Sequence, residues 1–290
     1  MGKPKPELIA DYRCHTGENP LWHPFENCLY WSDIPNGRLF RYFPDSGMHE
    51  QCYEGRQVGG FTIQEDGSLL LFMEKGAIAL FNSGKLEYVH KEIPEDRDSR
   101  FNDVIADPMG RVFCGIMPTK NKPGHLYRLD TDGSIHRILE GTGTPNGMGF
   151  TLDYSHFYFT DSTRKTVFIF KYSLNTGALT EKHLWLKTPD DGGSPDGMTV
   201  DSQGNIWSAR WNGSALFCFS AGGKELQRID FPAKKVSSVS FGGMNLEDMY
   251  ITTALTDSTR DVEGKGAGAL FRLKTGAKGR PEFFSKIVAG

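Results

Sequence analysis

The sequence predicts an all-β protein: one six-bladed β-propeller domain over residues 1–290, with a central tunnel. Three observations predict the propeller. Strand-like segments recur in pairs, Gly, Asp and Asn fill the turns between them, and helical periodicity is scarce. The pairs recur about every 40–50 residues, which is the period of propeller blades rather than of a helical solenoid.

Six segments open the pairs, and each is followed by a second strand-like segment. The first members are ENCLYWSD, DGSLLLFM, MGRVFCGI, YSHFYFTD, QGNIWSAR and LEDMYITT. The second members are GRLFRYFPDSG, GAIALFNSGK, GHLYRLDTDG, KTVFIFKYSLNTG, GSALFCFSAGGK and GALFRLKTG. Four antiparallel strands per blade, arranged around a tunnel, account for this pattern.

A ring of blades has to be closed by the two ends of the chain. PELIADYRC near the start and RPEFFSKIV near the end are both strand-like. We expect the N-terminal strand to complete the last blade. The irregular stretch at 253–268 is expected to be a surface insertion of that blade rather than a lid over the tunnel.

Composition and charge exclude several classes of protein. A formal net charge of −3, with the basic residues scattered along the chain, gives no basis for nucleic-acid binding. No apolar run approaches the roughly 20 residues that span a bilayer, and MGKPKPELIADYRC lacks the apolar region of a signal peptide. The five cysteines form no CxxC motif, which favours reduced thiols. We expect a cytoplasmic protein without a membrane partner, as a monomer or weak homodimer.

The positions before the first strand of each blade predict a metal site, because that strand lines the axis of a propeller. They are Glu18, Gly60, Asn102, Asn146, Asp196 and Ser238. Four of the six carry a carboxylate or amide oxygen, and an all-oxygen site suits Ca²⁺ or Mg²⁺ and tolerates Mn²⁺. Turn chemistry is the alternative explanation, since Asn, Asp and Gly are also the residues that turns prefer.

Four longer stretches resemble one known family. They are GENPLWHPFENCLYWSDIPNGRLFRY, RFNDVIADPMGRVFCGIM, TPNGMGFTLDYSHFYFTDS and SPDGMTVDSQGNIWSARWNG. With them the chain resembles the regucalcin, gluconolactonase and luciferin-regenerating enzyme family over nearly its whole length. The resemblance implies a six-bladed propeller with one divalent cation in the tunnel, Ca²⁺ first, with Zn²⁺, Mg²⁺ or Mn²⁺ as alternatives.

The resemblance also implies roles for individual residues. It implies that Glu18, Asn146 and Asp196 are the metal ligands, and that Asn102 lies close to the ion or the substrate. Arg100 matches the substrate-binding arginine of the family, and Asp196 matches its candidate general base. The family's activity implies hydrolysis of a sugar lactone.

The chain departs from the family pattern at two places. Asn19 stands where relatives usually carry a second glycine. Thr119 and Lys120 stand where sugar-acid lactonases often place a glutamate that holds substrate hydroxyls. Lys120 would favour an anionic group on the substrate, so the identity of the lactone does not follow from the resemblance.

The resulting hypothesis is metal-assisted hydrolysis of a sugar lactone. The cation would polarise the ester carbonyl, Asp196 would accept a proton from water, and Arg100 and Asn102 would hold the sugar oxygens. Two alternatives remain. One is hydrolysis of phosphotriesters or aryl esters by the same fold, and the other is a non-catalytic calcium-binding propeller.

Bulky side chains are assigned to packing or to the rim of the tunnel. Trp31 and Trp207 are expected in the core between blades, and Trp211 is expected at the rim. Met148 and Met198 each follow a glycine of the blade motifs, and we expect them to pack beneath the polar residues.

Overall fold

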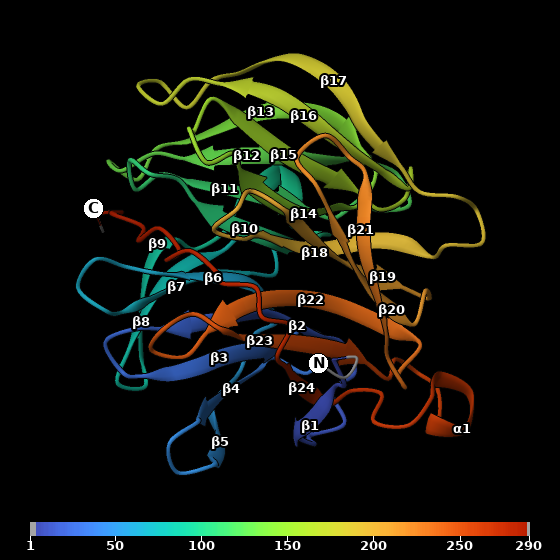
Figure 1. Ribbon diagram of the computed structural model, residues 1–290. Helices are drawn as coiled ribbons and strands as arrows, with labels where there is room; N and C mark the ends of the chain where they lie inside the picture. The colour runs from blue at the N-terminus through green and yellow to red at the C-terminus, as the bar shows by residue number, and fades with distance from the viewer. Residues whose placement is uncertain (1–3, 289–290) are drawn as a thin grey trace.

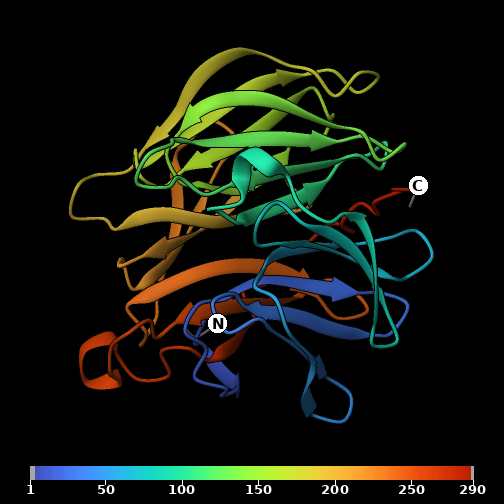
Figure 2. The same cartoon turned by 180° about the vertical axis from the view of Figure 1, so that it is seen from behind.

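The computed structural model describes residues 4–288 as a ring of six four-stranded antiparallel sheets, which confirms the predicted six-bladed β-propeller (Figures 1 and 2). In five blades the strands follow chain order from the axis outward. Among the described residues, no helix has the length and apolar character needed to cross a membrane.

The first three blades contain twelve consecutive strands. Blade one is β2 (Gly17–His23), β3 (Cys28–Asp33), β4 (Arg38–Phe43) and β5 (Met48–Glu54). Blade two is β6 (Val58–Ile63), β7 (Leu69–Met73), β8 (Ile78–Asn82) and β9 (Lys85–His90). A 3-10 helix, η1 (Pro94–Asp96), precedes blade three, which is β10 (Phe101–Ala106), β11 (Val112–Ile116), β12 (Gly124–Leu129) and β13 (Ile135–Thr142).

The remaining blades continue the pattern until the ring closes. Blade four is β14 (Pro145–Phe150), β15 (His156–Asp161), β16 (Thr166–Tyr172) and β17 (Leu179–Lys187). Blade five is β18 (Ser194–Val200), β19 (Ile206–Trp211), β20 (Ala215–Phe219) and β21 (Glu225–Asp230). Blade six is β22 (Lys235–Gly242), β23 (Asp248–Ala254), β24 (Leu270–Leu273) and β1 (Glu7–Ala10), with the short helix α1 (Arg260–Glu263) between β23 and β24.

Burial follows the distance of a strand from the axis. All residues of β6, β14 and β22 are buried, because neighbouring blades cover both faces of an inner strand. The outermost strands β5 and β17 are mostly polar and exposed. Trp31 and Trp207 are 1% and 3% exposed and pack in the core between blades, as the sequence predicts.

The N-terminal strand is the outer strand of the last blade. β1 pairs antiparallel with β24, with Glu7 opposite Arg272. Arg272 Nη2 also donates to the Glu7 carboxylate at 2.8 Å. Both ends of the propeller sequence therefore share one sheet, which joins the first blade to the last.

The C-terminal stretch 277–288, here called the C-terminal strap, is not the strand that RPEFFSKIV suggests. It has a single bridge, Gln64 with Ser285, and otherwise runs as irregular backbone across the tunnel. Its backbone hydrogen bonds go to four blades, through Ile63, Gly110, Ser202 and Leu246. A sheet partner is missing because successive residues of the strap bond to different blades.

Aromatic contacts extend the strap to the other two blades. Phe283 lies edge-on to Phe150 and Tyr154 of blade four. Phe284 stacks on Phe25 of blade one with ring centroids 5.1 Å apart. The strap therefore contacts all six blades.

The 253–268 insertion is held in place by contacts at several points. Leu255 N–H donates to Cys14 O at 3.1 Å, and Arg260 pairs with Asp11. The buried Glu263 forms an ion pair with Lys235. These contacts favour the expected surface insertion over a lid.

Replacing Phe283 with Ala is expected to destabilise the protein by about 2 kcal/mol, because a half-buried ring is lost from its contacts with blade four. Urea denaturation measures the change. Val288→Ala is the control in the same segment, since Val288 is 63% exposed and should change stability by less than about 0.5 kcal/mol. Equal effects of the two substitutions would contradict the packing role of the strap.

Candidate metal and substrate site

All six innermost strands carry a register irregularity at the same level of the tunnel. The irregularities lie between Glu18 and Leu21, Val58 and Gly60, Phe101 and Val104, Asn146 and Met148, Pro195 and Met198, and Val236 and Ser238. A β-bulge re-aims the side chains next to it. The six positions selected from the sequence lie inside strands and not before them. A preference for turns therefore does not explain why Asn, Asp and Gly occur at these positions.

The glycines of the two Pro-Asn/Asp-Gly-Met motifs permit close approach of neighbouring strands. A Cβ on Gly147 would lie 2.5 Å from Asp196 O, and a Cβ on Gly197 would collide with the Ser238 side chain. Neither glycine has a positive φ. Glycine is needed here because blades four, five and six meet at the axis, not because the chain turns.

Hydrogen bonds connect three of the predicted site residues. Arg100 Nη1 donates to Asn102 Oδ1 at 2.8 Å. Asn102 Nδ2 donates to Pro145 O at 2.8 Å and to Asn146 Oδ1 at 3.2 Å. The structure thus brings the polar positions of blades three and four together.

Ser162 is a site residue that the sequence analysis missed. Asn146 Nδ2 donates to Ser162 Oγ at 3.0 Å, and Ser162 Oγ donates to Pro195 O at 2.6 Å. Because Ser162 Oγ donates its proton to Pro195 O, it can only accept from Asn146. The Asn146 atom that faces Ser162 is therefore Nδ2, and Oδ1 is left for a ligand. The only sequence signal was the serine that ends FTDS, one residue beyond β15.

Two buried carboxylates supply the charge of the site. Glu18 is 7% exposed and Asp196 is 3% exposed. Burial raises the pKa of Glu18, and the nearby charge of Asp103 adds to the rise. Burial also raises the pKa of Asp196 well above its ordinary value, and the charges of Glu18 and Asp103 add to it.

Two cationic side chains lie near this pair: Arg100, and the buried Arg210, whose charge acts on Asp196. Burial lowers the pKa of the Arg100 guanidinium to about 10, although the charges of Glu18 and Asp196 favour the protonated form. Asp196 Oδ1 is buried and has no hydrogen-bond partner in the described part of the chain. An unsatisfied buried oxygen between like charges is costly, and a bound cation would remove that cost.

The available donors determine which ions fit. No three His, Cys, Asp or Glu side chains within residues 4–288 form a metal-binding group. A cation here therefore needs an amide oxygen as well as the two carboxylates. Glu18, Asp196 and Asn146 Oδ1 are hard oxygen donors of the kind that Ca²⁺ and Mg²⁺ prefer.

Asn19 links the first two blades beside the site. Its φ is +49°, a left-handed conformation that favours glycine and is also tolerated by asparagine. Its Oδ1 accepts from Phe61 N–H at 3.0 Å, and its Nδ2 donates to Phe61 O at 3.3 Å. The departure from glycine therefore keeps the backbone shape and adds a connection between blades.

Thr119 and Lys120, the two departures from the family pattern, lie on the β11–β12 connection and are less buried than Glu18 and Asp196. Lys120 is exposed, and its contact with substrate stays a prediction. Thr119 Oγ1 accepts from the N–H groups of Asn121 and Lys122, so its hydroxyl is used within its own turn. Trp211 is half-buried, with the Lys235 ammonium 5.8 Å from its ring centroid.

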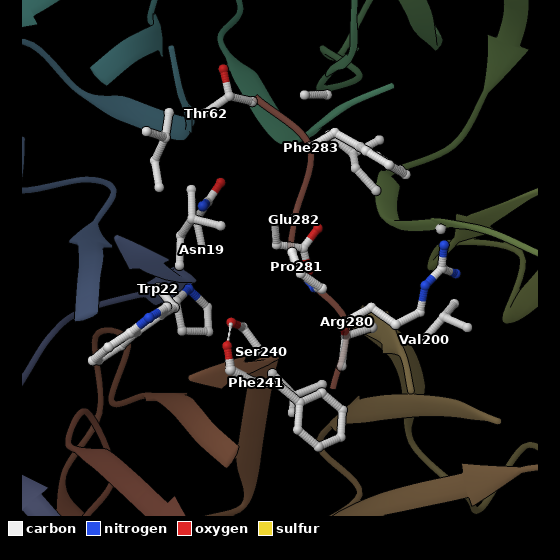
Figure 3. Close-up of a pocket in the computed structure, with 18 of the residues that line it drawn as sticks. Asn19, Trp22, Thr62, Val200, Ser240, Phe241, Arg280, Pro281, Glu282 and Phe283 are labelled. Atoms are coloured by element: carbon white, nitrogen blue, oxygen red, sulfur yellow. Dashed lines mark hydrogen bonds between the residues drawn. The ribbon is translucent and has the colours of Figure 1, made fainter. Parts of the chain in front are cut away.

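A cavity of about 260 Å³ lies next to the candidate site, and Asn19, Met148 and Met198 are among the residues that line it. Figure 3 shows the strap residues Arg280 to Phe283 running past it, with Asn19 and Trp22 on the opposite side. Met148 and Met198, which the sequence predicts to pack beneath the polar residues, are buried and line this cavity. Its two acidic groups were missed from the sequence: burial raises the pKa of Asp103 to about 6 and that of Glu282 to about 7.

The fold and the site together define a class of protein: a six-bladed propeller that gathers carboxylate and amide oxygens at one level of its tunnel. The family described as SMP-30/Gluconolactonase/LRE-like region matches residues 16–255. The chain belongs to this family.

Individual relatives cover almost the whole chain. It is 47% identical over 288 residues to pentonolactonase XacC of Haloferax volcanii, covering 97% of this chain and 98% of the relative. It is 31% identical to regucalcin of Danio rerio, covering 98% and 99%. The solved structure of a calcium-binding protein, regucalcin, from Agrobacterium tumefaciens superposes with a TM-score of 0.91 at 22% identity over 97% of both chains, which shows the shared fold.

Replacing Gly197 with Ala is expected to destabilise the protein by about 2–3 kcal/mol, because the added methyl group collides with Ser238 and forces blades five and six apart. Thermal and urea unfolding measure the effect. Gly222→Ala is the matched control, since a Cβ there meets nothing closer than 3.9 Å. A Gly197→Ala protein as stable as the control would contradict the close-approach explanation.

Glu282→Gln is expected to stabilise the protein at high pH. The pKa of Glu282 is about 7 in the folded protein against 4.5 ordinarily, so the folded state binds more protons between these values and stability falls as pH rises through that window. Relative to the unsubstituted protein, the variant should gain on the order of 2 kcal/mol between pH 4.5 and pH 8. Unfolding at both pH values tests this. The exposed Glu247→Gln is the control, and parallel pH profiles for the two variants would refute the prediction.

Proposed function

We propose that this protein is a divalent-cation-dependent lactonase that opens a sugar lactone. The observation that carries the proposal is the buried set of Glu18, Asp196 and the linked Arg100, Asn102 and Asn146 side chains. The 47% identity to a protein named pentonolactonase supports five-carbon sugar lactones as the first substrates to test.

Glu18, Asn146 and Asp196 would hold one divalent cation. Ca²⁺ is the first choice for this oxygen set, with Zn²⁺, Mg²⁺ and Mn²⁺ as alternatives. The similarity to a solved calcium-binding protein supports this order. When bound, such a cation supplies a Lewis acid for the ester carbonyl.

Arg100 and Asn102 bind the substrate, and Asp196 transfers the proton. The Arg100 guanidinium and the Asn102 amide hold the oxygens of the sugar. Asp196 accepts a proton from water as the water oxygen bonds to the carbonyl carbon. The same proton then passes to the ring oxygen as the ester C–O bond breaks, which yields the open hydroxy acid.

Asp196→Asn is expected to lower kcat/KM for pentonolactones by at least about 10²-fold, because it removes both a proton acceptor and a charged ligand. Proton release by an indicator dye measures turnover across pentonolactones, hexonolactones, aryl esters and phosphotriesters, with and without a chelator. Elemental analysis of protein purified without added ions identifies the bound metal.

Asp230→Asn is the control, because Asp230 lies exposed on β21 and pairs only with Arg228 among the described residues. Lactone turnover that survives the chelator would overturn metal dependence. Turnover of phosphotriesters or aryl esters without lactones would favour the alternative hydrolase. Bound calcium without any turnover would favour a calcium-binding propeller.

A further inference from the structure

The connection between β9 and β10 leads directly into the substrate-binding candidates Arg100 and Asn102, and it has an unusual buried anchor. Within residues 91–98, Ile93 and Asp96 are the buried side chains. Asp96, the last residue of η1, is 2% exposed. A carboxylate is almost never buried unless it is paired, so its partners indicate what it does.

Two side chains of β12 hold the Asp96 carboxylate. Tyr127 Oη donates to Asp96 Oδ2 at 2.8 Å, and His125 Nε2 lies 3.2 Å from the same oxygen. Burial alone would raise the pKa of Asp96, but these hydrogen bonds outweigh it, and the pKa lies below its ordinary value. The carboxylate therefore stays ionised and fastens the connection to blade three.

The same connection is bonded to the β11–β12 connection. Lys122 Nζ donates to Glu95 O at 2.6 Å and lies 3.6 Å from the Asp98 carboxylate. Ser99 Oγ donates to Met117 O at 2.7 Å. The two connections that carry the candidate substrate residues are thus fixed to each other.

A short backbone path joins Asp96 to Arg100. Ser99 N–H donates to Asp96 O at 3.0 Å, which closes a turn ending one residue before Arg100. Arg100 O then accepts from Met117 N–H at 3.0 Å. Loosening Asp96 would release the turn on the amino-terminal side of Arg100 while leaving Glu18, Asn146 and Asp196 in their own strands.

We propose that Asp96, held by His125 and Tyr127, is a positioning residue that sets the Arg100 guanidinium for substrate binding. The inference rests on the proposed lactonase function, because it assigns Asp96 an effect on the binding of the lactone. It predicts that Asp96 affects substrate affinity and leaves metal binding and the chemical step unchanged.

Asp96→Ala is expected to raise KM for the lactone about fivefold with kcat and metal content unchanged, because a mispositioned Arg100 loses binding made equally in the ground and transition states. Asp96→Asn, whose amide oxygen still accepts a hydrogen bond, should restore most of the affinity. Tyr127→Phe removes one donor while keeping the ring, and it tests the same anchor if Asp96→Ala does not fold. Asp132→Ala is the control, since within residues 4–288 Asp132 accepts hydrogen bonds only from Ser134, in an exposed turn of the same blade.

A double-mutant cycle decides whether Asp96 acts through Arg100. In an Arg100→Ala background, Asp96→Ala, or Tyr127→Phe in its place, should raise KM no further. The inference would be overturned if the two substitutions raised KM independently, so that their fold-changes multiplied. It would also be overturned if KM were unchanged in the anchor variants, or if KM rose equally in Asp132→Ala. Absence of lactone turnover in the unsubstituted protein would instead overturn the proposed function, so the two failures are distinguishable.

Discussion

Close contact between the innermost strands is the constraint on which the rest of the structure depends. At Gly147 and Gly197 the next blade lies so near that a methyl group has no room. This proximity brings side chains from blades one, three, four and five within reach of each other. The same closeness keeps water from Glu18 and Asp196, so that their ionised forms are costly there and a bound cation would offset this cost.

The periodic part of the structure was predictable because each blade repeats the same local pattern. Strand content, six blades and the polar positions Glu18, Asn102, Asn146 and Asp196 all follow from that repetition. Their placement just before the first strands was wrong, because Asn, Asp and Gly occur both in turns and in bulged strands, and the residues lie inside the strands.

Aperiodic contacts were not predictable. The Ser162 bond to Asn146 depends on the register between β14 and β15, which no local pattern specifies. Asp103 on β10 and Glu282 on the C-terminal strap line one cavity, although they lie far apart in the sequence. Family resemblance supplied a candidate role for Arg100, but it carried no information on the Asp96 anchor, which depends on side chains from two segments, η1 and β12.

The C-terminal strap has a consequence for how the molecule unfolds. In an open array of repeats each unit contacts only its neighbours, so end units can fray one at a time. Here a single twelve-residue segment, 277–288, contacts every blade, and releasing one blade requires breaking contacts shared with the others. We therefore expect the propeller to unfold in one cooperative transition, although its sequence consists of six similar repeats.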